Sequence, residues 1–150
     1  MGSVRVCTFA FLIAALATGC GTEARPVAYT DVTKEVGALE FMRITRGHYR
    51  ERAALLDVIS RNNPGRPPAL PPIDFSRHSA YLVAAGPRSS SGYELEIVSV
   101  RDEGHEIKVV VRERTPSLGD RVRPGVTYPF RLLALPRTED SVKLKWLGRP

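Results

Sequence analysis

The chain has 150 residues, which is enough for one domain with a single hydrophobic core. Its formal net charge is +6 at pH 7, but Lys and Arg are scattered along the sequence and form no basic cluster. We interpret the excess of positive charge as keeping the protein soluble beside an anionic cell surface. Weak attraction to anionic lipid headgroups would be a further consequence. Together with the export argued next, this excludes nucleic acid as a partner.

Residues 1–19 have the parts of a secretory signal peptide. Arg5 supplies a positive charge, and residues 6–18 are apolar or small, a run too short for a bilayer-spanning helix, which needs about 20 residues. The small residues 17–19 before Cys20 resemble the bacterial lipobox. We therefore expect cleavage after Gly19 and lipidation of Cys20, including a fatty acid such as palmitate. The alternative is an ordinary secretory signal followed by an incidental cysteine.

Cysteine usage supports the lipoprotein interpretation. Cys7 would be discarded with the signal peptide, so Cys20 would be the last thiol and no internal disulfide could form. A lipidated Cys20 leaves no free thiol, and two or more acyl chains are enough for stable anchoring. We expect a location in the bacterial cell envelope, anchored to the outer face of the cytoplasmic membrane or to the outer membrane.

The N-terminal half of the mature chain predicts a tether and one helix. Residues 20–35 read as the lipidated N-terminus and a flexible, polar tether, and residues 36–150 as a single domain. Residues 38–45 suggest a first strand, with a short helix as the alternative. Residues 48–61 carry apolar side chains at spacings of three and four, which predicts a helix that ends at the Asn-Asn-Pro-Gly sequence.

A proline-rich connector leads to the most apolar strand. Residues 66–72 contain four prolines, and residues 73–76 form a turn in which the Asp74 carboxylate caps nearby N–H groups. Residues 79–85 are almost continuously apolar, which is typical of a central strand buried on both faces. Residues 86–92 follow as a loop.

Residues 93–114 predict a β-hairpin. If the apolar residues of both strands share one face, Leu95 pairs with Val111, Ile97 pairs with Val109, and residues 102–104 form a three-residue loop. Such loops favour glycine at the left-handed position, and Gly104 occupies it. This register also sets Glu94 opposite Arg112.

The C-terminal part predicts two more strands. Residues 115–125 read as a loop, and residues 126–135 alternate as a strand that Pro129 places at an edge or a bulge. Residues 141–147 form a last strand with Val142, Leu144 and Trp146 inward. The expected fold class is α+β, with one helix packed on a small, mostly antiparallel curved β-sheet.

The inventory of reactive groups predicts no catalytic centre. His48, His78 and His105 have no zinc spacing and no cysteine partner. No nucleophile-elbow motif surrounds any serine, and the glycine-bounded loop 86–92 lacks a P-loop lysine. We expect no enzyme activity, no metal and no cofactor.

The order of motifs resembles the C-terminal domain of the protease complex subunit PrcB. Its elements are Pro-Ile-Asp-Phe-Ser at 72–76, an apolar strand ending in Gly86, Arg-Ser-Ser-Ser-Gly-Tyr at 88–93, a hairpin, and Thr-Tyr-Pro-Phe at 127–130. The resemblance covers residues 71–135. The motif residues are mainly turn-formers and aromatic core residues: Asp74, Phe75, Gly86, Gly92, Tyr93, Thr127, Tyr128 and Pro129. The family implies a non-catalytic extracytoplasmic lipoprotein domain that associates with and stabilises a surface protease.

Two functional hypotheses follow. The first is a membrane-anchored protein-interaction domain that binds an extracytoplasmic protein such as a protease, through loops 86–92 and 115–125 or by strand addition near Pro129. Its candidate contact residues are Arg88, Ser89, Ser90, Ser91, Arg121 and Arg123. The second is a lipoprotein that binds a small ligand or a cell-wall polymer, using Arg88, Tyr93, Arg121, Arg123 and Tyr128.

Overall fold

The computed structural model describes residues 23–148, apart from residues 64, 66 and 68. The expected signal peptide, the Cys20 lipidation site and part of the proline-rich connector lie outside the described residues. The elements in chain order are β1 (Arg25–Pro26), β2 (Thr30–Asp31), the 3-10 helix η1 (Thr33–Val36), β3 (Thr45–Tyr49), α1 (Arg52–Arg61), β4 (His78–Ala84), β5 (Arg88–Ser90), β6 (Glu94–Asp102), β7 (Glu106–Arg114), β8 (Pro124–Thr127), β9 (Phe130–Pro136) and β10 (Ser141–Leu147).

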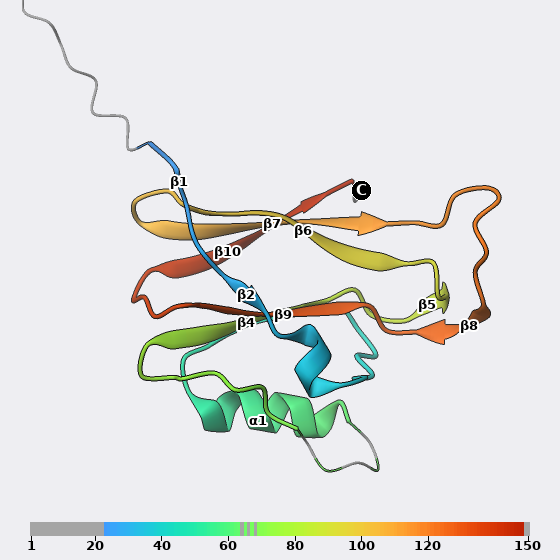
Figure 1. Cartoon of the computed structure of the whole chain (residues 1–150), viewed down its shortest axis with the longest axis horizontal. Coiled ribbons are helices and arrows are strands. Elements are labelled where there is room, and N and C mark those ends of the chain that lie inside the picture. The colour runs from blue at the N-terminus through green and yellow to red at the C-terminus, as the bar shows by residue number, and fades with distance from the viewer. Residues whose placement is uncertain (1–22, 64, 66, 68, 149–150) are drawn as a thin grey trace, which may run out of the picture.

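Two stacked four-stranded sheets and one α-helix form three layers (Figure 1). The first sheet has the order β1-β6-β7-β10, the second has the order β2-β9-β4-β3, and a separate two-stranded sheet joins β5 to β8. The pairings are antiparallel except for β10 and β7, which run parallel. The described part of the chain is therefore mostly β, with α1 packed on the outer face of the second sheet. The single curved sheet that we expected is replaced by this stack.

The second sheet is buried on both faces, which explains the stack. Ala80, Leu82 and Ala84 of β4 face α1 and pack with Leu55 and Ile59. The alternate residues of the same strand point the other way, into a core shared with the first sheet. A strand that is apolar on both faces needs cover on both, and the helix and the first sheet provide it. The prediction of a buried central strand is confirmed.

The N-terminal segment differs from the predicted tether. β1 pairs with β6 and β2 pairs with β9, so residues 25–31 cross from the first sheet to the second. Val32 and Val36 are buried in the helix-side core. The sequence around these buried valines shows no apolar periodicity. β1 and β2 form only because the longer strands β6 and β9 offer them an edge to pair with.

Residues 38–44 form neither the predicted strand nor the alternative helix. Leu39 and Phe41 are buried nonetheless, and Phe41 packs against Phe130 with ring centroids 5.6 Å apart. The strand begins later, at Thr45, and the predicted helix over residues 48–61 begins at Arg52. Pairing with β4 holds His48 and Tyr49 in an extended conformation, which local helical spacing could not reveal.

The hairpin is present, but its register is shifted by two residues. Ile97 pairs with Val111 and Glu94 with Arg114, and an irregularity at Val98 moves the register again, so that Val100 pairs with Val109. The strands are joined by residues 103–105, and Gly104 has a φ of 92°. The left-handed glycine is thus confirmed. The predicted pairing is wrong because the loop begins one residue later than expected, at residue 103, and because the bulge adds an unpaired residue that alternation alone does not show.

Pro129 interrupts the predicted strand over residues 126–135 and divides it into β8 and β9. β9 lies inside the second sheet, between β2 and β4, so the expectation of an edge strand is corrected. The carbonyl of Pro129 accepts a hydrogen bond of 2.9 Å from the Ala85 N–H. β10 forms as predicted, with Val142, Leu144 and Trp146 packed against the inter-sheet core. None of the described helices is both long and apolar enough to cross a bilayer.

Candidate functional site

Two loops that are distant in sequence converge at one end of the molecule. β5 pairs with β8, so that Arg88 lies opposite Thr127 and Ser90 opposite Pro124. We call residues 88–92 and 115–127 the paired-loop arm. Figure 1 shows it projecting at the right-hand end, beyond the ends of the two stacked sheets. The loops 86–92 and 115–125, expected as separate contact regions, are therefore one surface, and each contains residues of a short strand.

Backbone and hydroxyl groups hold the two halves of the arm together. The Ser91 N–H donates to the Arg123 carbonyl at 3.0 Å, and the Arg123 N–H donates back to Ser91 Oγ at 2.9 Å. The Thr127 hydroxyl donates to the Ser90 carbonyl at 2.7 Å. The Ser91 hydroxyl and the backbone groups of Ser90 and Ser91 thus fasten one loop to the other.

Gly92 is required by the close approach of the second loop. A Cβ atom at this position would lie 2.5 Å from Val122 Cγ1 and 2.7 Å from Pro116 Cβ. Real Cβ atoms do not approach carbon atoms so closely, so any other residue would push the loops apart. The glycine of the family motif therefore serves the assembly of the arm.

A tight turn at the tip of the arm presents an apolar side chain. The Ser117 N–H donates to Asp120 Oδ2 at 2.7 Å, and the Asp120 N–H donates to the Ser117 carbonyl at 3.1 Å. Gly119 between them has a φ of 96°, which favours glycine. The turn leaves Leu118 fully exposed to solvent.

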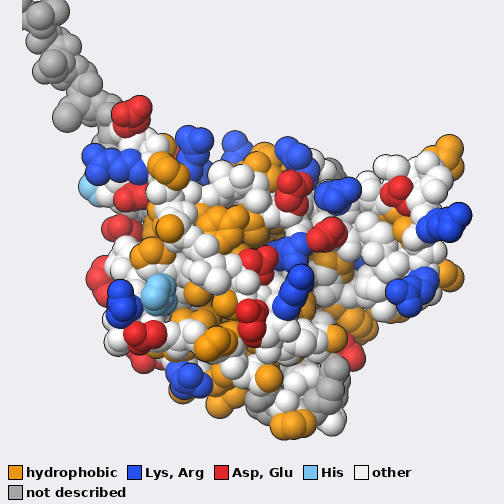
Figure 2. All heavy atoms as spheres, in the orientation of Figure 1, with side chains coloured by type: hydrophobic (Ala, Val, Ile, Leu, Met, Phe, Trp, Pro, Cys, Tyr) orange, Lys and Arg blue, Asp and Glu red, His pale blue; other side chains and the backbone are white. Residues whose placement is uncertain are grey.

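The arm combines exposed apolar and cationic side chains (Figure 2). Val126 is 65% exposed and Val122 is 36% exposed. Arg121 and Arg123 are exposed, and neither forms an ion pair with another described residue. A shallow cleft of about 590 Å³ lies at the base, bordered by Ser91, Gly92, Glu113, Ser117, Asp120 and Arg121. Such a mixture is typical of protein-contact surfaces, where arginine and apolar groups are enriched.

Arg88 lies at the base of the arm and binds within the protein. Its Nε and Nη2 atoms donate to the two carboxylate oxygens of Glu113, the latter at 3.0 Å. The two side chains are only 17% and 11% exposed. The hydrogen bond that Arg88 donates to Glu113 raises the pKa of Arg88 above its ordinary value. The structure thus places Arg88 in a partly buried ion pair rather than on the open surface that we expected.

The other residues of the family motif have structural positions. Asp74 Oδ1 accepts hydrogen bonds from the N–H (3.0 Å) and the hydroxyl (2.6 Å) of Ser76, which lower the pKa of Asp74. Phe75 packs against the helix-side core. Gly86 is buried with a φ of 79° and approaches the backbone of Arg43. Tyr93 and Tyr128 are half-buried.

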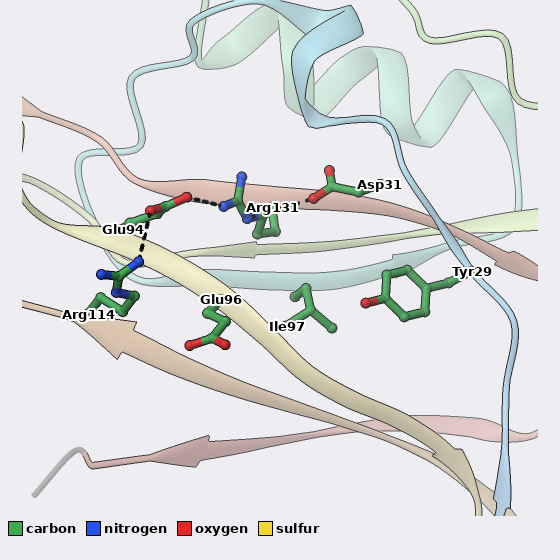
Figure 3. Close-up of a pocket in the computed structure, with 7 residues that line it drawn as sticks. All are labelled: Tyr29, Asp31, Glu94, Glu96, Ile97, Arg114 and Arg131. Atoms are coloured by element: carbon green, nitrogen blue, oxygen red, sulfur yellow. Dashed lines mark hydrogen bonds and ion pairs between the residues drawn. The ribbon is translucent and has the colours of Figure 1, made fainter.

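A second feature, the charged cleft between β6 and β9, was not found from the sequence (Figure 3). Arg131 points between the sheets and donates to Glu94 Oε1 and to the Leu95 carbonyl, each at 2.6 Å. Its Nε atom lies 3.7 Å from Asp31 Oδ2, and Arg114 approaches Glu94 from the other side at 4.0 Å. The cleft holds about 290 Å³. The positive and negative side chains of this cleft compensate one another, and their ion pairs link β2, β6 and β9.

A third feature lies at the opposite open edge, between β3 and β10. His48 and Tyr81 border a cleft of about 300 Å³. His48 Nε2 lies 2.8 Å from Ser79 Oγ, and burial lowers the pKa of His48, with a smaller contribution from Arg50. Burial raises the pKa of Tyr81 to about 12. Among the described residues, no group of three His, Cys, Asp or Glu side chains is placed to hold a metal ion.

Comparison with known families finds one match, in the central part of the chain. The model of the family described as PrcB C-terminal matches residues 80–136. The matched segment runs from β4 to β9 and contains the whole paired-loop arm. No curated protein and no solved structure matches the chain.

Proposed function

We propose that this protein is a lipid-anchored, extracytoplasmic, non-catalytic module that binds a protein partner, such as a secreted or surface protease, through the paired-loop arm. The observation that carries the proposal is the convergence of the two loops on one projecting surface. The arm displays Leu118 and Val126 beside Arg121 and Arg123. Within the described part of the chain, none of these four side chains belongs to a core cluster or forms an ion pair. The match to the PrcB C-terminal family supports a protease complex as the partner.

The shape of the arm favours a protein as the ligand. Its cleft is shallow and open, whereas small-molecule sites are usually deep and largely apolar. The apolar groups at the tip project outward, as contact residues do when they enter a partner's surface. Arg88 was expected in the contact sets for both kinds of ligand, and its ion pair with Glu113 leaves Arg121 and Arg123 as the cations that the arm offers to a partner.

Capture of the partner tests the proposal. A chain with a C-terminal tag is recovered from solubilised membranes, and the bound proteins are compared between the natural sequence and Leu118→Asp. Leu118 is fully exposed, so the substitution should leave the melting temperature unchanged and reduce partner recovery by roughly tenfold or more, as loss of a contact hot spot does.

A matched control is available on a different surface. Met42 is 69% exposed and lies outside the arm, so Met42→Asp introduces the same charge at the same kind of position. Partner recovery should be unaffected by Met42→Asp. Equal recovery by Leu118→Asp and the natural chain would exclude the arm as the binding surface.

The anchor is tested separately. Cys20→Ser should prevent incorporation of a labelled fatty acid and leave an unprocessed or a soluble form of the protein. Continued labelling of this variant would contradict lipidation at Cys20.

A further inference from the structure

The outer face of the first sheet carries a row of three cations. Arg101 pairs with Lys108 across β6 and β7, and Lys108 pairs with Lys143 across β7 and β10. Each alternates with residues that point into the inter-sheet core, so all three lie on the outer face. Because neighbouring strands are about 4.8 Å apart, three positive side chains share about 10 Å of one face.

This arrangement has a cost within the protein. Like charges directly opposite each other on neighbouring strands destabilise a sheet. Lys108 forms an ion pair with Glu103, but Arg101 and Lys143 form none with a described residue. Lys145, on the same face of β10, is likewise exposed and forms no ion pair with a described residue. An anionic surface outside the protein would compensate these charges.

The acidic residues of this face do not cancel the row. Glu96 lies 3.9 Å from Arg112, and Glu106 lies at the end of β7, opposite Ser141. In Figure 2, Lys and Arg side chains gather along the upper rim, above the sheet that contains β6, β7 and β10. This face points away from α1, which covers the opposite side of the molecule (Figure 1).

The chain enters the fold beside the same row. Pro26 of β1 pairs with Arg101, so β1 lies beside the row of cations, at the edge of the sheet opposite β10. Arg25 follows Cys20 by only five positions, and five residues span at most about 18 Å when fully extended. An acyl chain on Cys20 would therefore hold the three cations within reach of the lipid headgroups.

We infer that the outer face of the first sheet lies on an anionic bilayer, with Arg101, Lys108 and Lys143 against phospholipid phosphates next to the lipid anchor. The inference deepens the proposed function and depends on its lipid anchor. It orients the domain, because α1 then faces away from the membrane and the paired-loop arm extends sideways from the anchored end. Each Lys or Arg near such a surface contributes about 1 kcal/mol, or about fivefold in the equilibrium constant.

The test measures which face of the anchored protein is shielded. The purified lipidated protein is inserted into vesicles of phosphatidylcholine alone or mixed with phosphatidylglycerol. A thiol-reactive fluorophore is placed at Val110→Cys on the outer face of β7 or, in a control, at Ala54→Cys on the exposed side of α1. Acrylamide, an uncharged quencher, reports exposure to water.

The Val110 probe should be shielded only in vesicles that contain phosphatidylglycerol, and the Ala54 probe should be quenched in both. Adding Lys143→Glu should reduce the shielding equilibrium roughly fivefold or more, whereas Arg52→Glu on α1 should leave it unchanged. Lys143→Glu places a carboxylate opposite Lys108, so its melting temperature should be equal to or above that of the parent, and loss of folding cannot explain the result.

Equal quenching of the Val110 probe in both vesicles would overturn the inference, as would shielding that survives Lys143→Glu. Recovery of the protein without acyl chains would also overturn it, since the anchor would be missing. None of these results depends on a partner protein, so failure here is distinct from failure of the paired-loop arm in the capture experiment.

Discussion

The ion pair between Arg88 and Glu113 allows a quantitative prediction about the base of the arm. Glu113 occupies the inward-facing register of β7, two residues beyond Val111, where a core residue would otherwise stand. The guanidinium of Arg88 meets its carboxylate with two hydrogen bonds, and both side chains are less than one-fifth exposed. Removal of either partner breaks both of these hydrogen bonds and deprives a poorly solvated charge of the opposite charge beside it.

We expect Arg88→Met and Glu113→Leu each to lower the free energy of unfolding by about 3 kcal/mol, the lower end for a broken buried ion pair, because some solvent reaches the site. For a domain of this size that loss corresponds to a fall of roughly 10 °C in melting temperature. The double variant Arg88→Met/Glu113→Leu should be close to the natural protein, since matched apolar residues can replace a buried pair at little net cost.

Urea unfolding of all four proteins forms a double-mutant cycle that measures the coupling. Arg88→Glu should be worse than Arg88→Met, because it sets two carboxylates together. If Arg88→Met costs less than about 1 kcal/mol and the two single effects simply add, the pair contributes little. Arg88 would then be available to a partner after all.

Three further predictions follow from local geometry. Gly92→Ala should lower the free energy of unfolding by about 1–3 kcal/mol through overpacking against Val122; urea unfolding checks it, and an unchanged midpoint would refute the close approach. Gly104→Val should cost on the order of 1 kcal/mol or more, because a β-branched residue resists a φ of 92°; an unchanged melting temperature would contradict the turn geometry. Burial lowers the pKa of His48, so its contribution to stability is present above the unfolded pKa of about 6.5 and is lost as the pH falls through the folded pKa. His48→Asn should therefore flatten the decline in melting temperature between about pH 6.5 and 5, and an identical decline would show that His48 is not its source.

Some features of this protein could be predicted because their physical causes are local. The run of apolar residues that forms β4 requires cover on both faces whatever lies around it, so burial of that strand follows from composition. Asp74 accepts hydrogen bonds from its own turn, two residues along the chain, and Gly104 has its conformation set by a short hairpin loop. The inward positions of Val142, Leu144 and Trp146 follow from alternation alone.

Other features depend on groups that only the fold brings together. β1, β2 and β3 form on the edges of strands that lie far along the chain, so no local pattern announced them. The bulge at Val98 shifts the hairpin register because β6 must turn Val100 inward, a demand that comes from the second sheet. The serines at 89–91 suggested a free loop, but the hydrogen bonds of Ser90 to Thr127 and of Ser91 to Arg123 make this segment half of the paired-loop arm.

The charged residues show the same difference between what the sequence determines and what the tertiary structure decides. The sequence determines how many Lys, Arg, Asp and Glu residues the chain has, and these look scattered along it. Tertiary structure decides which of them meet: Arg88 reaches Glu113 in a partly buried pair, while Arg101, Lys108 and Lys143 share one row of a sheet. Electrostatic energy depends on distance in space and on exposure to water, and neither can be read from positions 7 to 42 residues apart in sequence.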